Sequence, residues 1–201
     1  LCRNKALKAA VEKPEKVKLF LNVDGNIIQD KAFIQGFTNR KAMKAGVPAS
    51  DIVFEITERS DIENYQILQQ IMKHYADQGY EIALDDVGAG HSGLNRVVNT
   101  TPDYLKADIE LVRDIHKYKK KEIMMKLLLD YCNATGAILI AEGIETVQEL
   151  ECLHSLGVHY GQGFFLGKPE RAFGNISAES EEILERLNGR KNILFLDISG
   201  K

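Results

Sequence analysis

Short apolar runs alternate with longer amphipathic stretches along the chain. The runs are typical of β-strands, and they occupy residues 17–23, 52–56, 82–84, 104–106, 137–141 and 164–166. Between them, apolar residues recur at helical spacing, for example at Ile67, Leu68, Ile71 and Met72 and at Ile123, Leu127, Leu128 and Tyr131. Gly136 is expected to end the second of these helices.

Repeated alternation of strands and helices indicates a parallel sheet covered by helices, as in a doubly wound sheet or a (β/α) barrel. We favour a TIM-type (β/α) barrel, an α/β fold, over residues 1–175. Residues 176–201 predict an extra C-terminal helix and a further strand, either packed on the barrel or leading into another domain. In such barrels the reactive groups lie at the C-terminal ends of the strands.

Composition narrows the classes of function. The 201 residues carry a formal net charge of -3, which supplies no basic field for duplex nucleic acid. No apolar run reaches the roughly 20 residues that a membrane span needs. Cys2, Cys132 and Cys152 have no CxxC spacing, so we expect reduced thiols in a cytoplasmic protein, although the parent protein could be membrane-attached.

Polar residues, most of them carboxylates, lie at the ends of most of the predicted strands. They are Asn22, Glu55, Glu58, Asp85, Asp86, Lys106, Asp108, Glu142, Glu145 and Gln162. Converging carboxylates repel one another, and oxygen ligands suit Mg²⁺ or Mn²⁺. A pair of such ions would polarise a phosphate and activate water. Any single carboxylate could instead cap a helix or form a surface ion pair, so the prediction of a two-metal site depends on the joint arrangement.

Lys106 would add a positive charge beside this centre, and Glu142 is a candidate general base. The glycine-rich segment at residues 85–94 predicts a flexible loop that approaches a ligand closely. It lacks the lysine of a Walker-type phosphate loop.

Six motifs carry a family resemblance. They are LNVDGN (residues 21–26), FEITER (54–59), ALDDVGAGHSGL (83–94), DYLKADIELV (103–112), AEGIET (141–146) and GQGFFLGKP (161–169). Their order and spacing resemble those of EAL-domain cyclic di-GMP phosphodiesterases, over nearly everything from residue 1 to residue 169. The resemblance implies cyclic di-GMP as ligand, linear pGpG as product, a homodimer and flanking regulatory domains.

The resemblance also implies roles for single residues. Asn22, Glu55, Asp85 and Asp86 would be metal ligands. Lys106 would contact the nucleophilic water or the second metal, and Glu142 would be its base or a further ligand. Gln162 and Asp108 would be substrate-binding residues, while Glu58 and Glu145 would anchor the loop at residues 86–92 and support dimer-coupled activation.

One departure from the family bears on function. The family is named after a Glu-Ala-Leu on its first barrel strand, and no such strand precedes LCRNKALKAA, so we expect a barrel that is incomplete at its N-terminus. Two functions follow: hydrolysis of cyclic di-GMP, or a catalytically impaired module that binds cyclic di-GMP or a protein partner and signals without hydrolysis. A third, an unrelated metal-dependent barrel enzyme, has only fold-level analogy behind it.

Overall fold

The computed structural model describes residues 2–14, 17–23, 42–56, 65–88, 93–169 and 175–188. Over these ranges strands and helices alternate along the chain as in an incomplete α/β barrel, which confirms the predicted fold class. The chain forms two compact units, which are described separately. The first contains the described residues up to Asp85 and residues 93–103, and the second contains residues 86–88 and those from Tyr104 onward.

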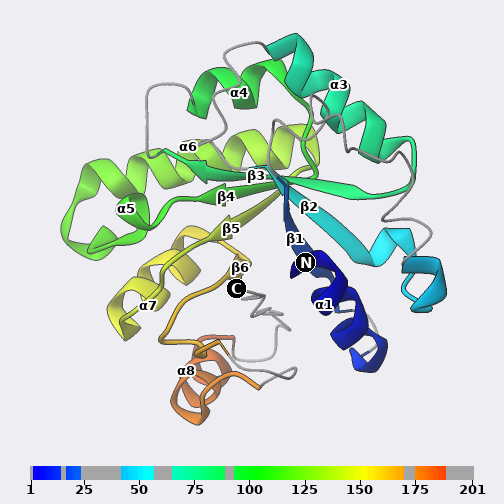
Figure 1. Ribbon diagram of the computed structural model, residues 1–201. Helices are drawn as coiled ribbons and strands as arrows, with labels where there is room; N and C mark the ends of the chain where they lie inside the picture. The colour runs from blue at the N-terminus through cyan, green and yellow to red at the C-terminus, as the bar shows by residue number, and fades with distance from the viewer. Residues whose placement is uncertain are drawn as a thin grey trace. The chain divides into compact units, whose positions relative to one another are not determined.

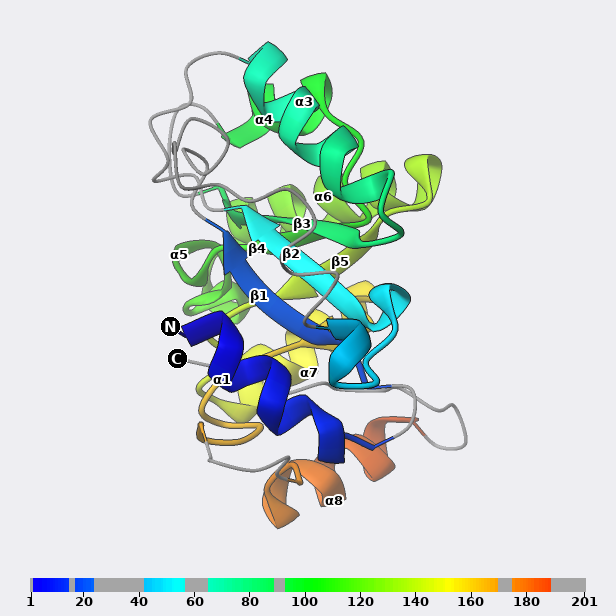
Figure 2. The ribbon, with the colours of Figure 1, turned by 45° about the vertical axis from the view of Figure 1, so that its right-hand side comes forward.

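The first unit is built on parallel strands. Strand β2 (Ile52–Ile56) lies between β1 (Leu19–Val23) and β3 (Glu81–Val87), whose last two residues belong to the second unit. Figure 2 shows β1 and β2 running side by side. The helical elements are α1 (Cys2–Ala9), η1 (Ala10–Glu12), η3 (Ala49–Asp51), α3 (Tyr65–Ala76) and α4 (Gly93–Asn99).

Strand β2 forms the centre of this unit's core. Every one of its residues is buried, and the strand pairs with a neighbour on each side. The Phe54 ring centroid lies 4.2 Å from that of Tyr75 on α3 and 4.8 Å from that of Tyr80, which precedes β3. The continuous apolar run that predicted this strand therefore reflects burial on both faces.

The second unit repeats this plan around β5 (Ile138–Ala141), which pairs in parallel with β4 (Tyr104–Ala107) and β6 (Tyr160–Gly161). Helices α6 and α7 flank β5 in Figure 1. The helical elements are α5 (Ile109–Val112), η4 (Ile115–Lys117), α6 (Lys119–Thr135), α7 (Val147–Leu156) and α8 (Ala178–Asn188).

Helix α6 ends at Gly136, as predicted, and its buried face includes only some of the apolar residues at helical spacing. Gly136 adopts φ 81° and donates its N–H to the Cys132 carbonyl at 2.9 Å. Ile123 and Leu127, two of the apolar residues at helical spacing, are 52% and 57% exposed. The buried face consists of Met125, Leu128, Leu129 and Cys132. The apolar residues of α6 lie on more than one side of the helix, so their spacing alone could not identify which side is buried.

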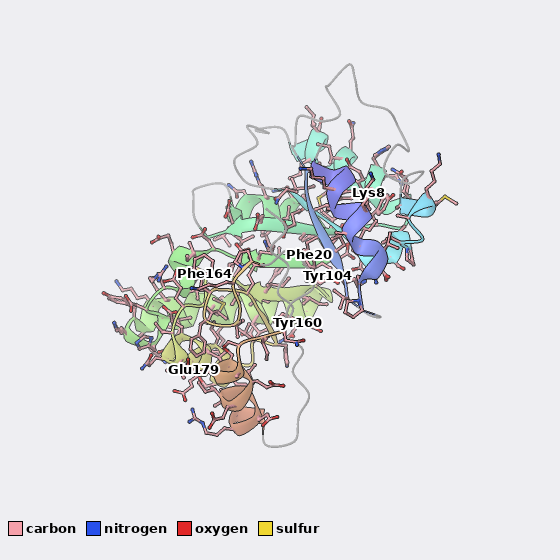
Figure 3. All side chains as sticks on the ribbon, turned by 60° about the horizontal axis from the view of Figure 1, so that its bottom comes forward. Lys8, Phe20, Tyr104, Tyr160, Phe164 and Glu179 are labelled. Atoms are coloured by element: carbon pink, nitrogen blue, oxygen red, sulfur yellow. The ribbon has the colours of Figure 1, made fainter. Side chains whose placement is uncertain are left out.

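The segment after β6 also differs from expectation. Residues 164–166 were predicted as a strand but form a turn, in which Leu166 donates its N–H to the Gly163 carbonyl at 3.0 Å. Phe164, labelled in Figure 3, is 62% exposed. Two aromatic residues followed by Leu favour a strand locally, and the turn at Gly163 overrides that preference.

The predicted C-terminal helix is confirmed as α8, which carries Glu179 in Figure 3. The Ser180 hydroxyl donates to the Phe165 carbonyl at 2.6 Å, and Arg186 forms an ion pair with Glu151 of α7 at 2.6 Å. The strand predicted within residues 192–198 lies outside the described residues. Among the helices described here, none has the length and apolar character of a membrane span.

The aromatic cluster on β2 gives a stability prediction. Phe54→Ala removes a fully buried ring, and we expect it to lower the free energy of unfolding by about 3–5 kcal/mol. Val98→Ala, at a position 74% exposed, should change it by no more than about 0.5 kcal/mol. Urea unfolding measures both, and equal effects would contradict the central position of Phe54 in the core.

Candidate metal centre and active site

In the first unit, side chains with amide or carboxylate oxygens lie toward the C-terminal ends of the strands. Asn22 on β1 and Glu55 on β2 are register partners. Glu55 is also the partner of Ala83 on β3, and Asp85 follows two residues later, so the period of two places Asp85 on the face of Glu55. Glu55 is only 6% exposed within an otherwise apolar strand. The predicted placement of these residues at strand ends is therefore confirmed.

Asp86 breaks the alternation of the strand. Successive strand residues point to opposite faces, which would separate Asp85 from Asp86. The backbone of Asp86 is left-handed, with φ 57°, a conformation that aspartate tolerates better than most residues. Asp86 belongs to the second unit with Glu142, and Asp85 is bonded to Asp86 through the chain. One carboxylate oxygen from each of the three lies within 4.8 Å of the other two.

A buried ion pair lies in the second unit. The Nζ of Lys106 on β4 is 2.5 Å from Oε1 of Glu142, which directly follows β5. The Nε2 of Gln162, which directly follows β6, donates to the same oxygen at 2.8 Å. Lys106 is only 4% exposed. Three neighbouring strand ends thus bring together three of the predicted site residues.

The backbone fixes this geometry. Glu142 donates its N–H to the Ala107 carbonyl at 3.0 Å, and Gln162 donates to the Ala141 carbonyl at 2.8 Å, so the sheet hydrogen bonding continues into both residues. Beyond them, Ile144 donates to the Gln162 carbonyl and accepts from Phe165, each at 3.0 Å. A Cβ on Gly163 would collide with the backbone of Ile144. The segments that follow β5 and β6 are therefore closely packed.

Asp108 has a structural role. Its carboxylate accepts from the Glu110 N–H at 2.7 Å and caps α5, while its own N–H donates to the Val87 carbonyl at 3.1 Å. It is a buried residue. Substrate binding by Asp108 stays a prediction.

Glu145 pairs with a residue that the sequence did not single out. Arg113 donates through Nη2 to Oε1 of Glu145 at 2.7 Å and through Nη1 to Oε2. This hydrogen bonding holds the pKa of Glu145 below its usual value and raises the pKa of Arg113. Glu58 and residues 89–92 of the predicted loop lie outside the described residues, so the anchoring role of Glu58 and Glu145 stays a prediction.

Glu149 was also missed, although its signal was in the sequence. Thr146 and Glu149 form a capping box at the start of α7, the pattern in which Ser or Thr is followed three residues later by Glu or Gln. Burial opposes ionisation of Glu149, but hydrogen bonds from the backbone of Asp114, Glu145 and Thr146 outweigh it, so its pKa is lowered.

The donor set suits a hard divalent cation. Asp85, Asp86 and Glu142 offer only carboxylate oxygens, the ligands that Mg²⁺, Mn²⁺ and Ca²⁺ accept, and no thiol or imidazole belongs to this described cluster. Three carboxylates at such separation repel one another, and a bound cation would relieve that repulsion. The described site therefore fits a metal ion.

Family comparison agrees with the fold. The family model of the EAL domain matches residues 2–169, and the chain belongs to this family. It is 25% identical over 150 residues to the cyclic di-GMP phosphodiesterase PdeB of Shewanella oneidensis. That alignment covers 75% of this chain and 17% of PdeB.

Solved structures with the same fold include two bound to cyclic di-GMP. Klebsiella pneumoniae BlrP1 at pH 6, a manganese and cyclic di-GMP complex, is 30% identical with a TM-score of 0.80, covering 87% of this chain and 45% of that one. The cyclic di-GMP-bound form of a standalone EAL protein from Vibrio cholerae is 28% identical with a TM-score of 0.79, covering 90% and 76%.

The close packing at Gly163 gives a second prediction. Gly163→Ala should destabilise the chain by roughly 3 kcal/mol, since the obstacle is backbone and cannot rotate away. Gly136→Ala, where no atom lies within 4 Å of the added Cβ, should cost only the roughly 1–2 kcal/mol of a left-handed alanine. Thermal unfolding compares the two glycine replacements, and a smaller effect at Gly163 would contradict the close packing.

Proposed function

We propose that this chain is the catalytic part of a phosphodiesterase that hydrolyses cyclic di-GMP to linear pGpG. The observation that carries the proposal is the buried Lys106–Glu142 pair, 2.5 Å apart, whose glutamate also belongs to the acidic cluster with Asp85 and Asp86. Family membership and the cyclic di-GMP complexes of the related structures support the choice of substrate.

The metal ligands follow from the two sets of strand-end oxygens. Asp85, Asp86 and Glu142 would hold Mg²⁺ or Mn²⁺. Asn22 and Glu55, register partners on β1 and β2, are proposed as further metal ligands. Two such ions supply charge stabilisation at the phosphate and lower the pKa of water. The manganese in the BlrP1 complex supports this assignment, as does the calcium of another complex of the same protein.

The chain's own residues then divide the remaining work. Glu142 accepts the proton that the attacking water loses. Lys106, held against Glu142, orients that water and stabilises the negative charge that develops on the phosphoryl oxygens. Gln162 keeps the Glu142 carboxylate in place and lines the site. One ester P–O bond breaks as the water oxygen bonds to phosphorus, the leaving ribose oxygen takes up the proton that Glu142 returns, and the cyclic dinucleotide opens to linear pGpG.

We also propose that the full-length protein is a cytoplasmic homodimer with flanking regulatory domains. The exposed apolar side chains of α6, Ile123, Met124 and Leu127, support a contact with another protein surface. The net charge of -3 supports a ligand that is not duplex nucleic acid.

Two matched ion pairs test the proposed roles. In the full-length protein with Mn²⁺, Lys106→Met and Glu142→Gln should each lower kcat for pGpG formation by about 10²–10⁴-fold. Lys119→Met and Glu122→Gln disrupt a pair with the same 2.5 Å separation on the exposed surface of α6 and should leave kcat unchanged. Product formation is followed by chromatography.

The same assay separates the proposal from its alternative. Correctly folded wild-type protein that binds cyclic di-GMP in calorimetry without forming pGpG would indicate a binding module that signals without hydrolysis. An equal loss of kcat in the α6 variants would show that the Lys106–Glu142 pair has no special part in turnover. Asp85→Asn should abolish turnover if Asp85 holds the metal.

A further inference from the structure

Glu149 is a buried carboxylate with an unusual set of partners. It is 1% exposed, and it lies at the third position of α7. Its Oε1 accepts the N–H of Asp114 at 2.8 Å. Its Oε2 accepts the N–H groups of Glu145 at 2.9 Å and Thr146 at 3.0 Å. A capping box requires only one bond from this side chain to the backbone, so two of the three exceed the ordinary motif.

These bonds join two segments of the second unit. Glu145 and Thr146 belong to the connection between β5 and α7, which begins with Glu142. Asp114 lies between α5 and η4 and has a left-handed backbone with φ 56°. A left-handed conformation costs about 1–2 kcal/mol in a residue with a side chain, and the bond to a buried carboxylate helps to hold it.

The connection between β5 and α7 has little freedom elsewhere. Ile144 is hydrogen-bonded to the segment after β6 on both its N–H and its carbonyl. Gly143 has φ 68°, and a Cβ there would collide with the Ile109 side chain. Glu149 fixes the two residues that follow, so every residue from Glu142 to Thr146 is held by the sheet, by close packing or by Glu149.

We infer that Glu149 is a positioning residue for Glu142. It does not contact substrate; it holds the backbone that carries the glutamate at which Lys106, Gln162 and the acidic cluster meet. The inference rests on the proposed function in naming Glu142 as the proton acceptor and metal ligand.

Ionised carboxylate, rather than any polar side chain of this shape, is required. Glu149 presents acceptors on both oxygens to three donors. A glutamine has the same shape but must turn its amide donors toward Asp114 or toward Glu145 and Thr146, whichever way it is flipped. At least one backbone N–H then faces another donor in a buried site, and the connection must shift.

Glu149→Gln is therefore the decisive variant, tested in the full-length protein. We expect kcat for cyclic di-GMP to fall about 10–100-fold with little change in KM, and Mn²⁺ affinity to weaken about 10–100-fold, as for residues that orient metal ligands. Glu151→Gln, two residues further along α7 at an exposed ion pair, should change neither. Calorimetry with Mn²⁺ alone measures the affinity.

Thr146→Ala separates positioning from simple helix stability. It removes the hydroxyl that accepts the Glu149 N–H at 3.3 Å, but it keeps the backbone N–H that Glu149 binds. We expect a lower Tm with kcat and Mn²⁺ affinity close to wild type. If Glu149→Gln lowers only Tm, or if both variants lose kcat and Mn²⁺ affinity equally, the positioning role is wrong.

The Mn²⁺ measurement also distinguishes this inference from the proposed function. If the wild-type protein binds Mn²⁺ but forms no pGpG, the proposed function fails, and the affinity of Glu149→Gln still decides the positioning role. If the wild-type protein binds no Mn²⁺, the site that Glu149 would position does not exist, and the inference fails with it.

Discussion

The buried ion pair between Lys106 and Glu142 constrains the strand register of the second unit. Removing a lysine ammonium from water costs several kcal/mol unless a carboxylate compensates for it. Lys106 lies on β4 and Glu142 directly follows the neighbouring strand β5, so the pair forms only in the register that aligns Ala107 with Ala141. A shift of one residue would turn one of them to the opposite face. Gln162 satisfies the same glutamate oxygen from the third strand.

Asp86 shows a second constraint, a strained backbone conformation within the candidate site. A regular strand would send adjacent aspartates to opposite faces, and the left-handed backbone at Asp86 brings both carboxylates to one cluster. Strained backbone of this kind persists where the surroundings hold it in place, and it is concentrated at functional sites. Here the neighbouring Val87 carbonyl accepts the Asp108 N–H, which ties the strained segment to the start of α5.

The sequence predicted most strongly where one physical effect dominated. The apolar run of β2 and the helix stop at Gly136 each have a single cause, burial on both faces and a left-handed cap, and both were confirmed. Carboxylates within or directly after apolar strands predicted a candidate site, because burying a carboxylate costs free energy unless it has a partner. Arg113 could not be found this way, because its partner Glu145 lies 32 positions away and Arg113 itself follows no apolar strand.

The position of Glu142 depends on contacts of its backbone as much as on contacts of its side chain. Glu142 has several rotatable bonds, so its carboxylate stays beside Lys106 only if its Cα is fixed. Sheet hydrogen bonding fixes that atom from one side. On the other side, glycine at 143 and the bonds to Glu149 confine the connection to α7. For the proposed base Glu142, a residue distant from the substrate can therefore lower kcat through the backbone, although by less than a residue that touches the reacting atoms, because a displaced base loses part of its near-attack geometry.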